Sequence, residues 1–236
     1  MPQMVSESIY AQHTQAYAMH TENGVVNAGY DRPTILELCG DLRGKRVLEL
    51  GCAAGALTDQ LALRAADVVA VDREPRLVSV ARKRLGGRAR VEVADLEQPL
   101  RVATTASKDL IVASLVLHYV EHWTPLLAEV GRILVPGGTF VFSIHHPITG
   151  WLLSDMSDYH RIEIVSETWD LGGHAVQAQM YRRPLSSVFG ELRKAGFVID
   201  AVAEPRVTDP VGDADRQVVA VLRTQPVFLF IRAVRS

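Results

Sequence analysis

The chain has 236 residues, and its 25 Lys+Arg against 27 Asp+Glu give a formal net charge of −2. Apolar residues make up 48% of it, which excludes a disordered chain and is enough for a sizeable core. This charge balance argues against binding nucleic acid over a broad surface, which requires a strongly basic face.

The first 30 residues are polar with scattered aromatics, and they indicate an N-terminal arm. They lack the basic and apolar regions of a secretory signal. No apolar run in the chain reaches the roughly 18 residues of a membrane span. Two cysteines, Cys39 and Cys52, are too few for a disulfide framework or a four-ligand zinc site. We therefore expect a reduced, cytoplasmic setting and no membrane contact.

From Asp31 the pattern becomes regular, with Asp31 as the expected cap of a helix that has Pro33 in its first turn and ends at Gly40. Short apolar runs then predict seven strands, at 46–51, 68–72, 90–95, 109–114, 139–144, 197–204 and 226–234. Helices are expected at 58–65, 75–85 and 125–134, with a sharp turn at 136–138, and a further helix begins at its cap Ser186 and ends at Gly196.

Strands that alternate with helices at this spacing predict an α/β fold with a parallel sheet covered on both faces. Residues 145–185 interrupt the rhythm, have no clear period and contain Trp151, Tyr159, Trp169 and Tyr181. Long irregular segments in compact domains tend to be functional. We therefore expect a single domain with an insertion after the fifth strand, whose aromatic rings either line a substrate pocket or form a secondary core.

The stretch most informative about chemistry is VLELGCAAGALTDQL, followed by VVAVD. A strand ends in a turn of small residues, Gly51 to Gly55, and Asp72 ends the next strand, 21 residues after Gly51. Ligands of open parallel sheets bind at the carboxyl ends of strands, where small residues admit a ligand and a carboxylate can accept both hydroxyls of a ribose. A nucleoside site is therefore predicted. The dinucleotide fingerprint does not fit, because alanine stands at 53 and 56.

The turn resembles motif I of the class I S-adenosylmethionine-dependent methyltransferases, E/D-x-G-x-G-x-G, with alanine in place of one glycine. The resemblance extends over residues 31–144. Within this family the chain is similar to the small-molecule branch, which includes the methyltransferase type 11 and ubiquinone/menaquinone-biosynthesis-like enzymes. It implies a Rossmann-like, seven-stranded, mostly parallel sheet with helices on both faces and an antiparallel last strand. It also implies S-adenosylmethionine as cofactor and S-adenosylhomocysteine as product.

On this resemblance the domain 1–236 divides into an arm (1–30), a cofactor-binding core (31–144), a substrate lid (145–185) and a C-terminal part (186–236). Asp72 is expected to hold the ribose, Asp95 to lie near the adenine amino group, and Tyr17 to come over the methionine end. The residues expected at the cofactor are Tyr17, Glu49, Gly51, Cys52, Ala53, Gly55, Asp72, Arg73, Asp95, Leu96, Ser114 and Leu115.

Histidines near strand ends are the candidates for a general base, namely His118, His145 and His146. Each of them can instead be a structural residue that is held by hydrogen bonds and takes no part in catalysis. The stretch HYVEH at 118–122 also matches the spelling of inverted zinc proteases, but it directly follows a buried strand and is better explained as a strand-to-helix turn, so no metal is expected.

The predicted function is methyl transfer from S-adenosylmethionine to a small-molecule acceptor. One alternative is an RNA or protein methyltransferase, favoured mainly by the arginine-rich stretch 73–90, which more often is a solvated helix face. Another is a cofactor binder that does not methylate. The expected partner is a small molecule and not nucleic acid, and the sequence leaves the oligomeric state open.

Overall fold

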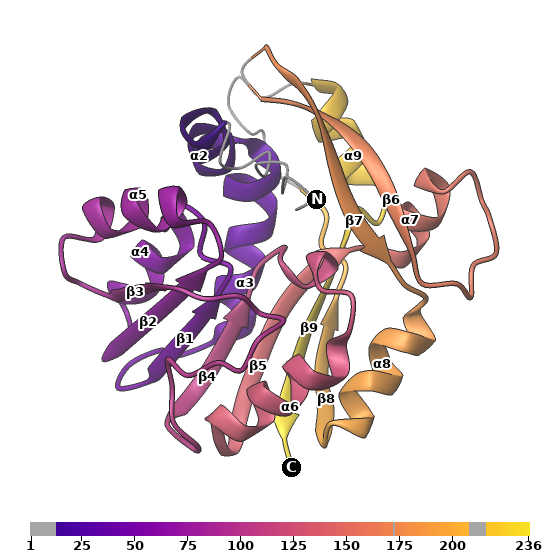
Figure 1. The fold of residues 1–236 in the computed structure, drawn as a ribbon. Helices are drawn as coiled ribbons and strands as arrows, with labels where there is room; N and C mark the ends of the chain where they lie inside the picture. Colours follow the sequence, from indigo (N-terminus) through magenta and orange to yellow (C-terminus); the bar gives the residue numbers. More distant parts are fainter. Residues whose placement is uncertain (1–12, 172, 208–215) are drawn as a thin grey trace, which may run out of the picture.

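A central sheet of seven strands organises the protein, seen in a computed structural model that describes residues 13–171, 173–207 and 216–236 (Figure 1). The strand order is β3-β2-β1-β4-β5-β9-β8. β1 to β5 are parallel, and β9 runs antiparallel between β5 and β8. The strands are β1 (Arg46–Leu50), β2 (Asp67–Asp72), β3 (Arg90–Val93), β4 (Lys108–Ala113), β5 (Leu134–His145), β8 (Phe197–Ala203) and β9 (Phe228–Arg235). The predicted fold class is confirmed.

Helices cover both faces of this sheet, because alternate residues of the strands point to opposite sides. Leu48 and Leu50 of β1 enter the core shared with α6 and α8, whereas Val47 enters the core shared with α3, α4 and α9. The helices are α2 (Thr14–Asn23), α3 (Arg32–Cys39), α4 (Ala56–Ala62), α5 (Pro75–Leu85), α6 (Trp123–Ile133), α7 (Pro147–Leu153), α8 (Leu185–Lys194) and α9 (Arg216–Thr224). No helix in the described ranges combines the length and apolar character required to traverse a bilayer.

The segment after β5 is more regular than the sequence pattern indicated. It contains α7 and an antiparallel hairpin of β6 (Glu163–Asp170) and β7 (Ala175–Arg182), which forms a separate two-stranded sheet. Figure 1 shows the hairpin and α2 at the same end of the central sheet, on either side of its middle. Arg182 is buried on β7 and bonds to Glu163 and to three backbone carbonyls between 158 and 161, which fixes the connection from α7 to β6.

Two local predictions were wrong in whole or in part. Asp31 stands at the N-cap position of α3, but its side chain makes no cap hydrogen bond, and a π-helical turn, η1 (Val25–Asp31), leads directly into that helix. Ser186 lies inside α8, whose cap is Pro184. The turn expected at 136–138 is present as an irregularity inside β5, where Gly137 has φ +75 and the pairing with β4 passes from Lys108–Leu134 to Leu110–Thr139.

Candidate functional site

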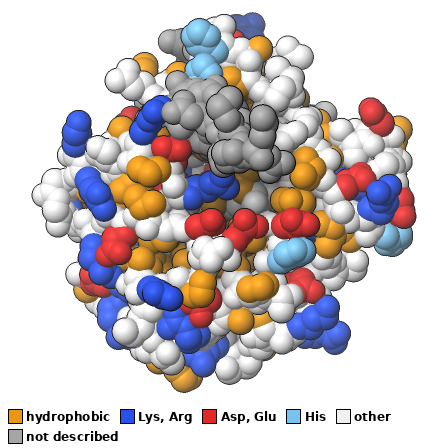
Figure 2. All heavy atoms as spheres, viewed as in Figure 1, with side chains coloured by type: hydrophobic (Ala, Val, Ile, Leu, Met, Phe, Trp, Pro, Cys, Tyr) orange, Lys and Arg blue, Asp and Glu red, His pale blue; other side chains and the backbone are white. Residues whose placement is uncertain are grey.

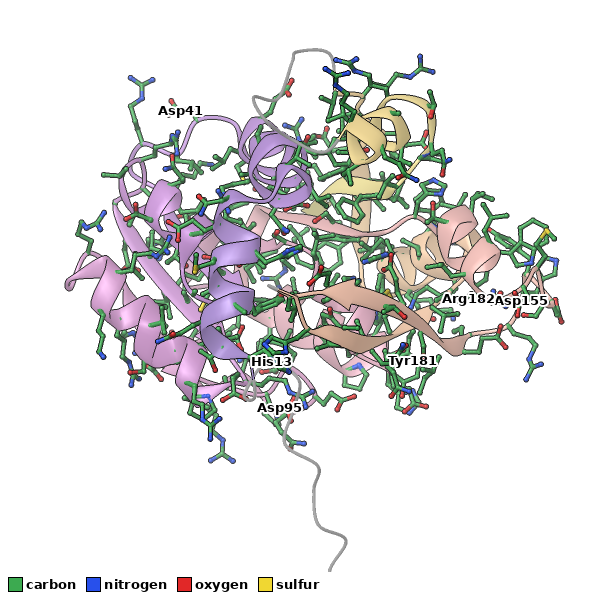
Figure 3. The ribbon with its side chains drawn as sticks, turned by 90° about the horizontal axis from the view of Figure 1, so that it is seen from above. His13, Asp41, Asp95, Asp155, Tyr181 and Arg182 are labelled. Carbon is green, nitrogen blue, oxygen red and sulfur yellow. The ribbon has the colours of Figure 1, made fainter. Side chains whose placement is uncertain are left out.

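A cavity of about 440 Å³ lies at the carboxyl ends of β1, β2 and β4. One wall comes from α2 and η1, with Tyr17 and Asn27, and the opposite wall comes from the hairpin, with Gln179 and Tyr181. Seen from above, Asp95 and Tyr181, which both line the cavity, lie on the same side of the molecule (Figure 3). The residues expected at the cofactor line this cavity with the exception of Gly55: Tyr17, Glu49, Gly51, Cys52, Ala53, Asp72, Arg73, Asp95, Leu96, Ser114 and Leu115.

The turn after β1 is held against β2 and is tightly packed. The N–H groups of Gly51 and Cys52 both donate to the carbonyl of Val71, at 2.8 and 2.9 Å. Gly51 has φ +74, and a Cβ there would lie 2.4 Å from Cγ2 of Val116, in the turn after β4. Only glycine fits this position without displacing the neighbouring turn.

Two further positions of the turn adopt positive φ. Ala53 has φ +46, so it keeps the left-handed conformation usually given to glycine. Gly55 has φ +81, and a Cβ there would lie 3.1 Å from Cβ of Ala81. Gly55 does not line the cavity, and its close approach to Ala81 shows that it allows α4 to approach α5, so its expected contact with the cofactor stays a prediction.

Asp72 performs a structural task that the motif did not reveal. Its Oδ2 accepts the N–H of Ala53 at 2.8 Å, and its Oδ1 accepts the N–H of Glu74 at 2.9 Å. The carboxylate thus ties the end of β2 to the turn after β1. Burial raises its pKa. Each oxygen keeps a further lone pair with which a ligand hydroxyl can bond.

Two buried carboxyls face the cavity from below. Glu49 at the end of β1 is 2% exposed, its Oε2 has no hydrogen-bond partner, and burial raises its pKa to about 7. Asp31 is also 2% exposed, and burial raises its pKa to about 6 although two serine hydroxyls donate to it. Asp31 was missed as a site residue, because a polar residue before a helix with proline in its first turn is typical of a cap.

The three histidines proposed as bases lie outside this cavity, around a second, much smaller hollow. His118 is buried, neither ring nitrogen has a partner, and burial lowers its pKa. Its ring lies 4.7 Å from that of His145. His146 accepts the N–H of Ile148 with Nδ1 and lies 2.8 Å from Glu204 with Nε2. Met180 and Tyr181 line both hollows, so the base role stays a prediction.

The zinc-protease spelling at 118–122 does not form a metal site. Leu117–Tyr119 is a short 3-10 turn, and α6 begins only at Trp123, so His118 and His122 do not share a helix. Within the described ranges, no group of three His, Cys, Asp or Glu side chains is placed to hold a metal ion.

The aromatic residues of the insertion have different surroundings. Tyr181 lines the cavity, and its hydroxyl donates to Glu121 at 3.0 Å. Trp151 and Tyr159 lie against each other with ring centroids 6.1 Å apart, and Trp169 packs on the small core of the hairpin. The pocket-lining interpretation therefore fits Tyr181, whereas a secondary core fits the other three.

Comparisons with known proteins agree with this geometry. A family model described as a methyltransferase domain matches residues 48–142. A ubiquinone biosynthesis O-methyltransferase of Xanthomonas oryzae is 35% identical over 106 residues, a match that covers 44% of this chain and only 44% of that relative.

Solved structures extend the likeness over most of the chain. An S-adenosylmethionine dependent methyltransferase from Mesorhizobium loti has 26% identity and a TM-score of 0.68, covering 86% of this chain and 96% of its own. A structure from Listeria monocytogenes, described as a candidate methyltransferase of the same kind, has a TM-score of 0.77 at 22% identity, covering 89% and 99%. Together with the strand order and the glycine turn at its cavity, these matches identify an S-adenosylmethionine-dependent methyltransferase, with a methyltransferase domain that matches at residues 48–142.

Proposed function

We propose that the protein transfers the methyl group of S-adenosylmethionine to a small-molecule acceptor that sits beneath the hairpin. The observation that carries this proposal is one cavity that contains both the glycine turn with Asp72 and the hairpin residues Gln177, Gln179 and Tyr181. Its volume of about 440 Å³ is in the range of small-ligand sites and leaves little room for a macromolecule.

The chain's own groups fit the cofactor. The unpaired Oε2 of Glu49 is a buried acceptor at the cavity, suited to the ammonium group of the methionine end. Asp72 has lone pairs left for the ribose, and Leu96 offers an apolar surface beside Asp95 for the adenine. When bound, the cofactor supplies an electrophilic methyl group on a sulfonium.

The part of the cavity proposed to hold the methyl acceptor is lined by uncharged residues. It consists of Tyr119 and Val120 after β4 and of Ile164, Gln177, Gln179, Met180 and Tyr181 from the hairpin. Amide and phenol groups can bond to a polar acceptor, while the apolar members exclude water. The Xanthomonas oryzae relative is an O-methyltransferase, so a hydroxyl is the first acceptor group to test.

Alignment of the acceptor behind the methyl carbon supplies the larger part of catalysis in this proposal, because positioning alone can contribute about 7 to 11 kcal/mol. His118 and His145 are proposed to receive the acceptor's proton only if the wall formed by Met180 and Tyr181 opens. His146 is a weaker candidate, since Ile148 and Glu204 already occupy both of its nitrogens.

The arginine-rich stretch gives little support to the alternative of an RNA substrate. Arg84 pairs with Glu22, Arg88 with Asp59 and Arg90 with Glu92. Figure 2 shows acidic side chains in a row across the middle of the face that is drawn. A polyanion would have to displace these ion pairs and approach that row.

Two measurements test the proposal. Calorimetry with S-adenosylhomocysteine tests the cofactor, and we expect saturable binding at one site. Release of S-adenosylhomocysteine from S-adenosylmethionine is then followed with a small-metabolite fraction, total tRNA or a protein extract. We expect release with the first alone. Release only with tRNA or protein would overturn the small-molecule acceptor, and cofactor binding without any release would favour a binder that does not methylate.

A further inference from the structure

Asp31 lies at the centre of a buried hydrogen-bond network beneath the cofactor cavity. The hydroxyl of Ser114 donates to Oδ2, and the hydroxyl of Ser143 donates to Oδ1, each at 2.5 Å. These serines stand at the carboxyl ends of the neighbouring strands β4 and β5. The carboxyl of Asp31 therefore joins the segment before α3 to two central strands.

The network continues to a strained residue. The N–H of Leu115 lies 3.0 Å from Oγ and 3.2 Å from the carbonyl oxygen of Ser143 and donates to both. Leu115 has φ +48, a left-handed conformation that costs a residue with a side chain about 1 to 2 kcal/mol. Such a conformation persists only when its surroundings impose it. Ser143, oriented by Asp31, is the side chain that holds this backbone.

Leu115 and its neighbour Val116 form part of the cavity floor, and Val116 packs directly on Gly51. The conformation at Leu115 thus sets how the turn after β4 meets the turn after β1. Arg32, which follows Asp31 in the chain, points away from the two serines, and its guanidinium donates to the carbonyl of Thr21 at 2.9 Å. Thr21 belongs to α2, which forms the wall of the cavity.

We propose that Asp31 is a positioning residue for cofactor binding: it orients Ser114 and, through Ser143, holds Leu115 in the left-handed conformation that shapes the floor of the cofactor site. The proposal concerns hydrogen bonding and assigns Asp31 no part in the transfer itself. It rests on the cofactor of the proposed function and not on the acceptor, so a failure to find a small-molecule acceptor leaves it standing.

The test is a double-mutant cycle on S-adenosylhomocysteine affinity, measured by calorimetry. We expect Asp31→Ala and Ser143→Ala each to weaken binding about tenfold, the effect of losing a buried hydrogen bond to a charged group. The double variant should also lose about tenfold, because both changes release the same turn. Asp31→Asn should bind within about threefold of wild type, since its amide can accept from Ser143 and donate to Ser114.

Controls use the same substitutions away from the network. Asp41→Ala removes an exposed aspartate on the far side of the molecule (Figure 3), and Ser107→Ala removes an exposed hydroxyl at the opposite end of β4. Both should keep wild-type affinity. Urea unfolding shows whether each variant is folded, and Ser143→Thr, which keeps a hydroxyl, and Asp31→Asn keep the proposal testable if Ser143→Ala does not fold, since both should retain affinity.

Additive losses, about a hundredfold in the double variant, would show that Asp31 and Ser143 act independently and would overturn the proposal. Asp31→Asn as weak as Asp31→Ala would overturn it too, because charge rather than hydrogen bonding would then matter. A wild type that does not bind S-adenosylhomocysteine would refute the cofactor and this inference together. Wild-type binding without transfer to any small molecule would count only against the acceptor.

Discussion

Replacing Gly51 by alanine tests whether the close approach of two turns shapes the cofactor site. The added Cβ would lie 2.4 Å from Cγ2 and 2.6 Å from Cβ of Val116, and the residue has φ +74. The left-handed backbone costs about 1 to 2 kcal/mol. Overpacking against Val116 costs a further energy of about 1 to 3 kcal/mol. We therefore expect Gly51→Ala to lower the free energy of unfolding by about 2 to 5 kcal/mol.

Gly44 separates these two costs. It has nearly the same φ, +73, but a Cβ there would meet nothing within 4 Å. Gly44→Ala should therefore lose only the backbone part, about 1 kcal/mol after the reduced entropy of the unfolded chain is counted. Equilibrium unfolding in urea measures both variants, and calorimetry with S-adenosylhomocysteine should show lost affinity in Gly51→Ala alone.

A second substitution isolates the contact itself. Val116→Gly removes Cβ, Cγ1 and Cγ2, the three atoms nearest to the added Cβ, so Gly51→Ala made in the Val116→Gly background should cost only the backbone part and not the overpacking part. Equal losses in Gly51→Ala and Gly44→Ala, or no recovery in the combined variant, would refute the idea that the two turns are packed to contact.

Three further predictions address other parts of the site. Ala53→Gly should raise the free energy of unfolding by up to about 1 kcal/mol in urea, because φ +46 favours glycine, and a loss would contradict the strain argued for this position. Burial raises the pKa of Glu49 from its ordinary 4.5 to about 7, so its contribution to stability is full below pH 4.5 and lost as the pH rises through 7. Between pH 4.5 and 7 the free energy of unfolding should fall by about 3 kcal/mol, and Glu49→Gln should remove this fall. A variant with the same pH profile as the wild type would refute the raised pKa of Glu49. Arg182→Lys should speed amide hydrogen exchange over 154–163, because an ammonium cannot span the acceptors that the guanidinium reaches, whereas exposed Arg43→Lys should not.

The sequence predicted the central sheet and most of the residues that line the cavity, for a physical reason. Buried parallel strands appear in the sequence as continuous apolar runs, and the glycine turn is formed by residues that are close together in the sequence, so both can be recognised locally. Gly55 shows the limit of this argument. Its motif position was correct, but only its neighbours in space reveal that it serves the packing of α4 on α5.

Asp31 and the histidines show what local patterns cannot supply. Asp31 finds its partners 83 and 112 residues away, so nothing near it in the sequence distinguishes a buried network from a helix cap. His118 follows β4, whose end meets the cavity, and His145 is the last residue of β5, yet both side chains border the second, smaller hollow. Strand position therefore predicts the neighbourhood of a residue and not what it faces.

The hairpin explains why the acceptor is harder to predict than the cofactor. Residues opposite each other on paired strands share a face, so Val165 and Met180 point one way while Ser166 and Gln179 point the other. The first pair is buried and holds the hairpin on the domain. Gln177 and Gln179 are exposed and line the cavity, so their exchange alters what meets the acceptor without removing packing. The period of two thus places Gln177 and Gln179 on the face opposite the anchoring pair, although Met180 of that pair also reaches the cavity, so the residues that meet the proposed acceptor can be exchanged with little loss of packing. The cofactor side is built largely from backbone turns and has no such freedom.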